Sequence, residues 1–297
     1  MREYVIVTDS GSDLEKSLRE QFGVEYFPMR CIINEEDYEA DLDWGHMSAH
    51  DFYQMMRDGA RARSAQVNVS VFKEGFKKIL DEGKDILYVA TSSKISASVN
   101  AGMVAKEELL KEYPDSKIIV IDALRVCYAL GILVIRASEL KAEGKTIEET
   151  AAWIEENKLT VNMEGTVENL KYLRQAGRVT AASSFFAGLL NIKPVIIADA
   201  LGRNFAVEKV KGRRASLNRL AERVAESFVD VPYQRLFISH ADCLEDAETL
   251  KEMIFEKLGK TLDVHIGYVG CASGTAVGPG MISAHFFGKK VTLNKED

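Results

Sequence analysis

Several features are missing from this sequence, and each absence excludes a class of protein. No apolar run approaches the roughly 20 residues of a membrane-spanning helix, so we expect no stable membrane insertion. The amino-terminal residues lack the basic, apolar and small-residue order of a secretory signal. Acidic residues outnumber basic ones by 45 to 38, for a net charge of −7, which argues against a nucleic-acid partner. Together these absences predict a cytoplasmic protein.

Cysteine is scarce, and the four cysteines lie far apart in the sequence: Cys31, Cys127, Cys243 and Cys271. They show no paired spacing of the kind that binds metals. Disulfides persist mainly in oxidising compartments, so we expect packing thiols in a reducing one. His46 and His50 have a spacing that can bind zinc on a helix, but no metalloprotease motif surrounds them. We therefore expect no metal and no other cofactor.

Motifs for nucleotide binding and for hydrolysis are also missing. Two Gly-Lys-Thr triplets, at residues 144–146 and 259–261, lack the earlier glycine of a phosphate-binding loop, and each follows a predicted helix. No Gly-x-Ser-x-Gly nucleophile elbow occurs. The sequence therefore predicts neither an ATP site nor a serine hydrolase.

What the sequence does contain is a regular alternation of apolar runs and amphipathic segments. In the first half, predicted strands at residues 5–8, 86–90 and 118–121 alternate with predicted helices. This alternation favours an α/β fold with a mostly parallel, doubly wound sheet and flanking helices. The chain of 297 residues is long enough for two domains. We place an N-terminal α/β domain at residues 1–158 and a C-terminal α+β domain at residues 159–297.

The second half has a different pattern of predicted elements. We expect a helix at residues 183–190 and a hairpin formed by strands at residues 193–198 and 205–210. The glycine-rich run at residues 267–280 is expected to form a loop before the last short strands.

The most informative stretch lies at residues 86–102. An apolar run at residues 86–90 is followed by the hydroxyl-rich residues 91–98 and then by a predicted helix. Ligands of open α/β sheets bind at this kind of junction, where free N–H groups, the helix dipole and hydroxyls favour an anionic oxygen group. The stretch predicts a carboxylate or phosphate site, or serines that only cap the helix and close the loop.

Several segments, taken in order, resemble the DegV family of bacterial fatty-acid-binding proteins, and together they extend over nearly the whole chain. The matching residues are Thr8, Asp9 and Ser10 with Asp13 and Leu14; the loop of Ser64, Ala65 and Gln66; Ser92, Ser93 and the run to Ser98; Tyr172 and Leu173 with Gly177 and Arg178; residues 189–194; Arg213; His240; and Gly278, Pro279 and Gly280.

The resemblance implies a two-domain α/β protein, not an enzyme, that holds one long-chain fatty acid in an apolar tunnel between or beside the domains. By position, the carboxylate is expected at Ser64, where the family usually has threonine, and at Ser96. Ser92 and Ser93 are expected close to this group. Because a buried carboxylate needs hydrogen-bond donors, a serine loop suits this role.

The resemblance also implies a partner protein. In this family a separate kinase, related to dihydroxyacetone kinases, phosphorylates the bound acyl chain to an acyl-phosphate for phospholipid synthesis. Arg174 and Arg178 resemble the kinase-docking region, or are solvated charges at a helix end. The family commonly has a histidine near the ligand head where this chain has Ala276, a difference that bears on phosphorylation more than on binding.

A second hypothesis keeps the same loop but assigns it to an enzyme. Such an enzyme would act on a small carboxylated or phosphorylated substrate and would need a general base near Ser96. His240 and Asp9 are the candidate bases in the sequence.

Overall fold

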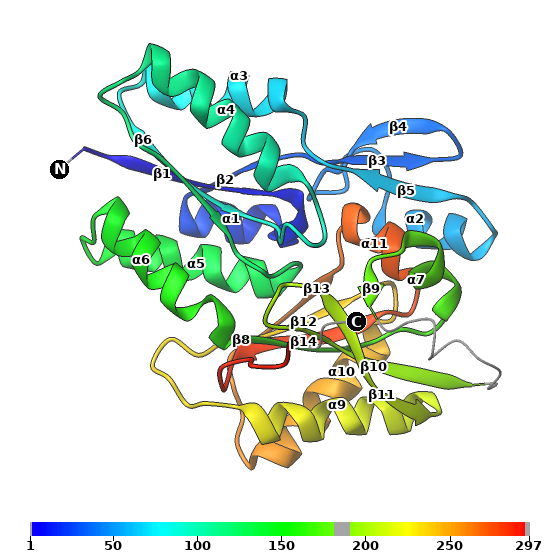
Figure 1. Ribbon diagram of the computed structural model, residues 1–297. Coiled ribbons are helices and arrows are strands. Elements are labelled where there is room, and N and C mark those ends of the chain that lie inside the picture. The colour runs from blue at the N-terminus through cyan, green and yellow to red at the C-terminus, as the bar shows by residue number, and fades with distance from the viewer. Residues whose placement is uncertain (1, 181–190, 295–297) are drawn as a thin grey trace.

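The computed structural model describes residues 2–180 and 191–294 (Figure 1). The helix expected at residues 183–190 lies outside these ranges. Within them, the strands form three sheets. In the same ranges, no helix combines the length and the apolar character needed to cross a membrane.

The first sheet is parallel and four-stranded, with the order β2-β1-β6-β7, which confirms the predicted parallel sheet. Its strands are β1 (Tyr4–Asp9), β2 (Val24–Phe27), β6 (Asp85–Ala90) and β7 (Ile118–Asp122). Helices α3 and α4 lie above it in Figure 1, and α1, α5 and α6 lie below it. These helices are α1 (Lys16–Phe22), α3 (Val69–Asp81), α4 (Ser98–Glu112), α5 (Tyr128–Ala142) and α6 (Ile147–Asn157). All six residues of β6 are buried, as expected for a strand that helices cover on both faces.

A small antiparallel sheet with the order β4-β3-β5 lies beside the first sheet. It consists of β3 (Arg30–Ile33), β4 (Glu36–Glu39) and β5 (Ala62–Ala65), with α2 (Ala49–Arg57) in the connection between β4 and β5. Ser64 therefore lies on a strand, opposite Cys31 of β3, and not on the loop that we expected. This strand was missed because arginines flank Ala62 on both sides, so the segment does not show a clear alternation of apolar and polar residues.

The third sheet is mixed and seven-stranded, with the order β13-β12-β14-β8-β10-β11-β9. Its strands are β8 (Val161–Thr166), β9 (Val179–Thr180), β10 (Ile192–Ala198), β11 (Asn204–Lys211), β12 (Leu236–His240), β13 (Val264–Tyr268) and β14 (Ile282–Phe287). Helices α9 (Arg213–Ser227) and α10 (Leu244–Leu258) share one core cluster with this sheet. Antiparallel pairing of β10 and β11 confirms the predicted hairpin.

Helix α5 lies between the two larger sheets and contacts β1 and β6 on one side and β8, β12 and β14 on the other. Its residues from Tyr128 to Ile135 are all buried. A helix that is apolar all round is typical of such a position. The four-stranded sheet ends at Asp122 and the seven-stranded sheet begins at Val161, so we keep the boundary after residue 158 as a proposal.

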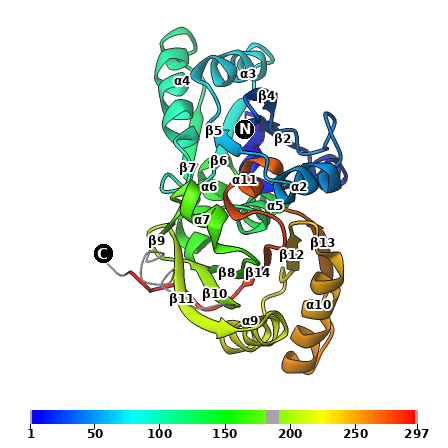
Figure 2. The ribbon, with the colours of Figure 1, turned by 90° about the vertical axis from the view of Figure 1, so that its right-hand side faces the viewer.

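The prediction of a loop at residues 267–280 was wrong. This run contains the end of β13 and the short helix α11 (Cys271–Val277), which packs on β5 and on α7 (Leu170–Ala176). Figure 2 shows α11 in the middle of the molecule, between α3 and α4 above and α9 and α10 below. A Cβ at Gly274 would lie 2.6 Å from Tyr53 Oη, so glycine is needed for this close packing. Helix α11 consists mostly of small residues, so its sequence has no amphipathic pattern from which a helix could be predicted. Tertiary packing stabilises it instead.

Candidate functional site

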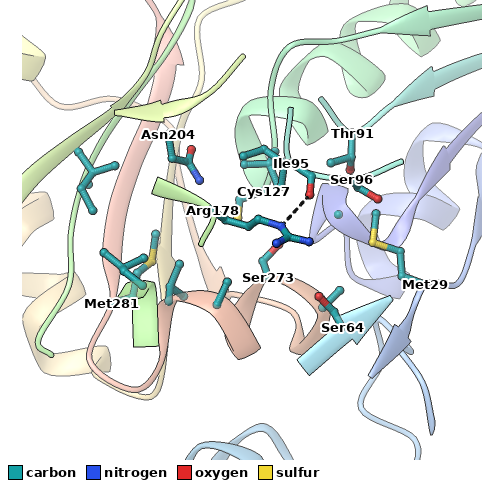
Figure 3. Close-up of a pocket in the computed structure, with 18 of the residues that line it drawn as sticks. Met29, Ser64, Thr91, Ile95, Ser96, Cys127, Arg178, Asn204, Ser273 and Met281 are labelled. Carbon is teal, nitrogen blue, oxygen red and sulfur yellow. Dashed lines mark hydrogen bonds between the residues drawn. The ribbon is translucent and has the colours of Figure 1, made fainter. Parts of the chain in front are cut away.

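A cavity of about 360 Å³ lies where the serine loop (residues 91–98), β5, β8, α7 and α11 meet (Figure 3). Much of its wall is apolar and buried, with Met29, Val126, Met163, Leu173, Ile196 and Met281 among the lining residues. Its polar lining residues include an arginine and several hydroxyls: Ser64, Thr91, Ser96, Arg178 and Ser273. The cavity therefore suits a ligand with a long apolar part and a small polar end.

The structure brings two of the four predicted serines to this cavity. Ser64, on β5, and Ser96, in the serine loop, both line it although they are far apart in the sequence. Ser64 is exposed and Ser96 is partly buried, whereas Met163 and Met281 at the apolar wall are buried. The hydroxyls thus mark the more accessible end of the cavity.

Ser92 and Ser93 have other surroundings, and neither is among the described residues that line the cavity. The buried Ser92 hydroxyl donates a hydrogen bond to the carbonyl of Gly202 at 2.7 Å. Ser93 is exposed, and its backbone N–H donates to Asp122. The Ser92 hydroxyl therefore holds the loop in place, which is the structural role left open above for the hydroxyls of this stretch. Ser93 contributes to the loop through its backbone N–H.

Asp9 holds two residues of the cavity wall, Gly11 and Thr91, in place. Its carboxylate accepts hydrogen bonds from the backbone N–H groups of Gly11 and Thr91 and from the hydroxyls of Tyr88 and Thr91. Burial raises the pKa of Asp9, and these hydrogen bonds lower it in part. Since the side chain is fully buried and has four donors, Asp9 is not available as a general base for a ligand.

His240, the other candidate base, is not one of the described residues at the cavity. Its Nδ1 accepts a hydrogen bond from the backbone N–H of Cys243 at 3.3 Å. Its ring packs on Tyr268 with 4.4 Å between the ring centroids. Burial lowers the pKa of His240. Neither of the two candidate bases, Asp9 and His240, is therefore placed to act beside Ser96.

From the sequence we expected Arg178 either in a kinase-docking region or as a solvated charge at a helix end, and in the structure this side chain also lines the cavity. Gly177, with φ of +61°, ends α7 in the left-handed conformation, and the chain turns there. Arg178 donates hydrogen bonds to the carbonyls of Ala176 at 2.8 Å and Ile95 at 3.4 Å. In Figure 3 its guanidinium group extends toward the side of the cavity that carries Ser64 and Ser96. Arg174 is exposed, on the last turn of α7.

Helix α11 contributes Ser273, which nothing in the sequence singled out, and Ala276, which the resemblance had already placed near the ligand head. Ser273 and Ala276, one turn apart, both line the cavity. Because we predicted a loop for this segment, nothing pointed to the Ser273 hydroxyl. A helix directs residues three apart to the same side, whereas a loop has no such regular direction. Ala276 leaves the wall apolar at this point. In the described ranges, no group of three or more His, Cys, Asp or Glu residues could hold a metal ion.

Comparison with known proteins agrees with this architecture. The DegV family model, described as "Uncharacterised protein, DegV family", matches residues 3–289. A DegV domain-containing protein of Clostridium perfringens is 36% identical over 288 residues, which cover 97% of this chain and 98% of that relative.

Two solved structures show the same fold. A fatty-acid-binding DegV family protein of Thermus thermophilus has a TM-score of 0.85 at 23% identity, covering 97% of this chain and 100% of its own. A stearic-acid-binding protein of Eubacterium ventriosum has a TM-score of 0.83 at 22% identity, covering 97% and 99%. Both are described as fatty-acid-binding proteins. The family model and the relative from Clostridium perfringens show that the chain belongs to the DegV family.

Proposed function

We propose that this protein binds one long-chain fatty acid in the cavity of about 360 Å³, with its carboxylate at Ser64 and Ser96. One observation carries the proposal. The two hydroxyls come from a strand and a loop far apart in the sequence, yet they line one cavity whose wall is otherwise mostly apolar. The fatty-acid-binding neighbours with the same fold support it.

The acyl chain supplies most of the binding free energy. Each buried methylene contributes about 0.8 kcal/mol, so a sixteen-carbon chain gains on the order of 12 kcal/mol before the cost of ordering. Three methionines, Met29, Met163 and Met281, line the cavity and adapt easily to the shape of a chain.

The carboxylate determines the orientation of the ligand. A carboxylate without donors is costly to bury, so it stays at the accessible end near Ser64 and Ser96. The guanidinium of Arg178 at the same cavity adds a charge-assisted hydrogen bond. With the two serines and Arg178 at the same end of the cavity, this orientation of the ligand is favoured.

We further propose that the protein works in the cytoplasm and presents the bound acid to a separate, dihydroxyacetone-kinase-like kinase, which forms an acyl-phosphate for phospholipid synthesis. The sequence has no phosphate-binding loop, so ATP must be bound by the partner. Arg174, exposed on α7, and Arg178, beside the cavity, offer cationic groups for docking next to the ligand head.

This step is tested by mixing the palmitate-loaded protein with such a kinase and ATP. The mixture should form an acyl-phosphate, which hydroxylamine traps as the hydroxamate. Arg174→Glu should slow its formation and leave palmitate affinity unchanged.

The binding step is tested by native mass spectrometry of the purified protein before and after addition of palmitate. We expect one acyl chain per protein. Ser64→Ala and Ser96→Ala should each weaken palmitate binding, whereas Ser93→Ala, at an exposed serine away from the cavity, should not. Absence of bound lipid together with no uptake of palmitate would contradict the proposal.

A further inference from the structure

Ser98 lies behind Ser96 and has no assigned role. It is the first residue of α4, and its side chain is fully buried. Its Oγ accepts a hydrogen bond from the backbone N–H of Val67 at 3.1 Å and lies 2.9 Å from Oγ of Ser96. The backbone N–H of Ser98 donates to Oγ of Ser96 at 3.2 Å. Each serine oxygen therefore already accepts one N–H group.

The positions of the hydroxyl protons follow from this arrangement. One of the two serines donates the hydrogen bond between them, and the other has a proton left over. If Ser96 were the donor, the proton of Ser98 would be buried without an acceptor, because Val67 and Ser96 are its hydroxyl's partners among the described residues. If Ser98 is the donor, the remaining proton belongs to Ser96, which lines the cavity. Buried polar groups are almost always hydrogen-bonded, so Ser98 donates.

We propose that Ser98 is a positioning residue that directs the hydroxyl proton of Ser96 toward the carboxylate of the ligand. This inference rests on the proposed function. Two hydrogen bonds accepted by Ser96 polarise its hydroxyl and make it a stronger donor. The bond to Val67 also connects the serine loop to the segment that follows Ser64, and so holds the two ligand-binding hydroxyls at a constant separation.

The test uses palmitate labelled with ¹³C at the carboxyl carbon, bound to the full-length protein. The chemical shift of the bound carboxyl is followed against pH, and palmitate affinity is measured in parallel. Ser98→Ala should raise the apparent pKa of the bound carboxyl and weaken palmitate binding about tenfold, as Ser96→Ala does, because one hydrogen bond to a charge is lost. Ser98→Thr, which keeps the hydroxyl, should restore both values.

Two controls separate positioning from a loss of loop structure. Hexadecanol has the same tail without a charge, so Ser98→Ala should leave its affinity nearly unchanged, whereas a collapsed loop would lower it. In the Ser96→Ala background, Ser98→Ala should cause no further loss. If the alanine variant does not fold, Ser98→Cys, which fills similar space with a weak donor, gives the same measurement.

Each outcome discriminates. A bound carboxyl whose titration is the same in the wild type and in Ser98→Ala would overturn this inference and leave the proposed function standing. Failure of Ser98→Thr to restore the titration, or an equal loss of hexadecanol, would also overturn it. A wild-type protein that shows no resonance of bound palmitate would overturn the proposed function itself.

Discussion

The carboxyl group of Asp13 should make the stability of this protein depend on pH near neutrality. Asp13 is 3% exposed, and its Oδ1 accepts a hydrogen bond at 3.0 Å from the backbone N–H of Gly270, directly before α11. Its Oδ2 is buried without a hydrogen-bond partner among the described residues. Burial is the main cause that raises the pKa of Asp13 from 3.8 to about 7. The group therefore prefers to be protonated in the folded state.

The sign and the size of the effect follow from this pKa. Between 3.8 and about 7 the folded protein binds a proton that the unfolded chain releases, so stability is full below the lower value and falls as pH rises through about 7. At about 1.4 kcal/mol per pH unit, the upper limit of the loss is about 4 kcal/mol. Asp13→Asn keeps an acceptor for Gly270 and cannot ionise, so the variant should escape this loss.

Chemical unfolding of both proteins from pH 4.5 to 8.5 measures the effect, with these limits set roughly around the transition. The free energy of unfolding of the wild type should fall relative to that of Asp13→Asn as pH rises, and the variant should be the more stable protein at the alkaline end. Glu164, whose pKa burial also raises to about 7, contributes equally to both and cancels in the difference. Two parallel curves would refute the argument that Asp13 is buried as a neutral acid.

Three further predictions concern the cavity and the core. Arg178→Gln should weaken palmitate binding about tenfold in a titration at low salt and leave hexadecanol binding unchanged; equal losses would refute a role for its charge. Gly274→Ala should destabilise the protein by roughly 1–3 kcal/mol in thermal unfolding, because the new Cβ meets Tyr53; an unchanged melting temperature would show that α11 shifts freely. Arg223→Met should cost roughly 3–5 kcal/mol, because it leaves the buried Glu164 without its partner at 2.6 Å. That cost should shrink below about pH 7, where Glu164 protonates.

The sequence alone was sufficient to predict the helices and strands whose apolar residues follow a regular pattern along the chain. Buried strands such as β6 are continuous apolar runs in the sequence, and residues 128–135 of α5 are apolar on every side because they lie between two sheets. The serine loop was found for the same reason, since it follows the end of one of these runs. Whether a segment forms a helix or a strand is largely a local property, and the spacing of its apolar residues predicts it.

Which hydroxyls face the cavity was decided by the tertiary structure. Ser92 and Ser96 are the same residue type in the same loop, yet the Ser92 hydroxyl donates a hydrogen bond to Gly202 and Ser96 lines the cavity. Ser273 reaches the same cavity only because α11 packs on β5, a contact between segments about 200 residues apart. Side-chain direction at such a site depends on which distant elements pack together, and residue spacing along a chain carries no information about that packing.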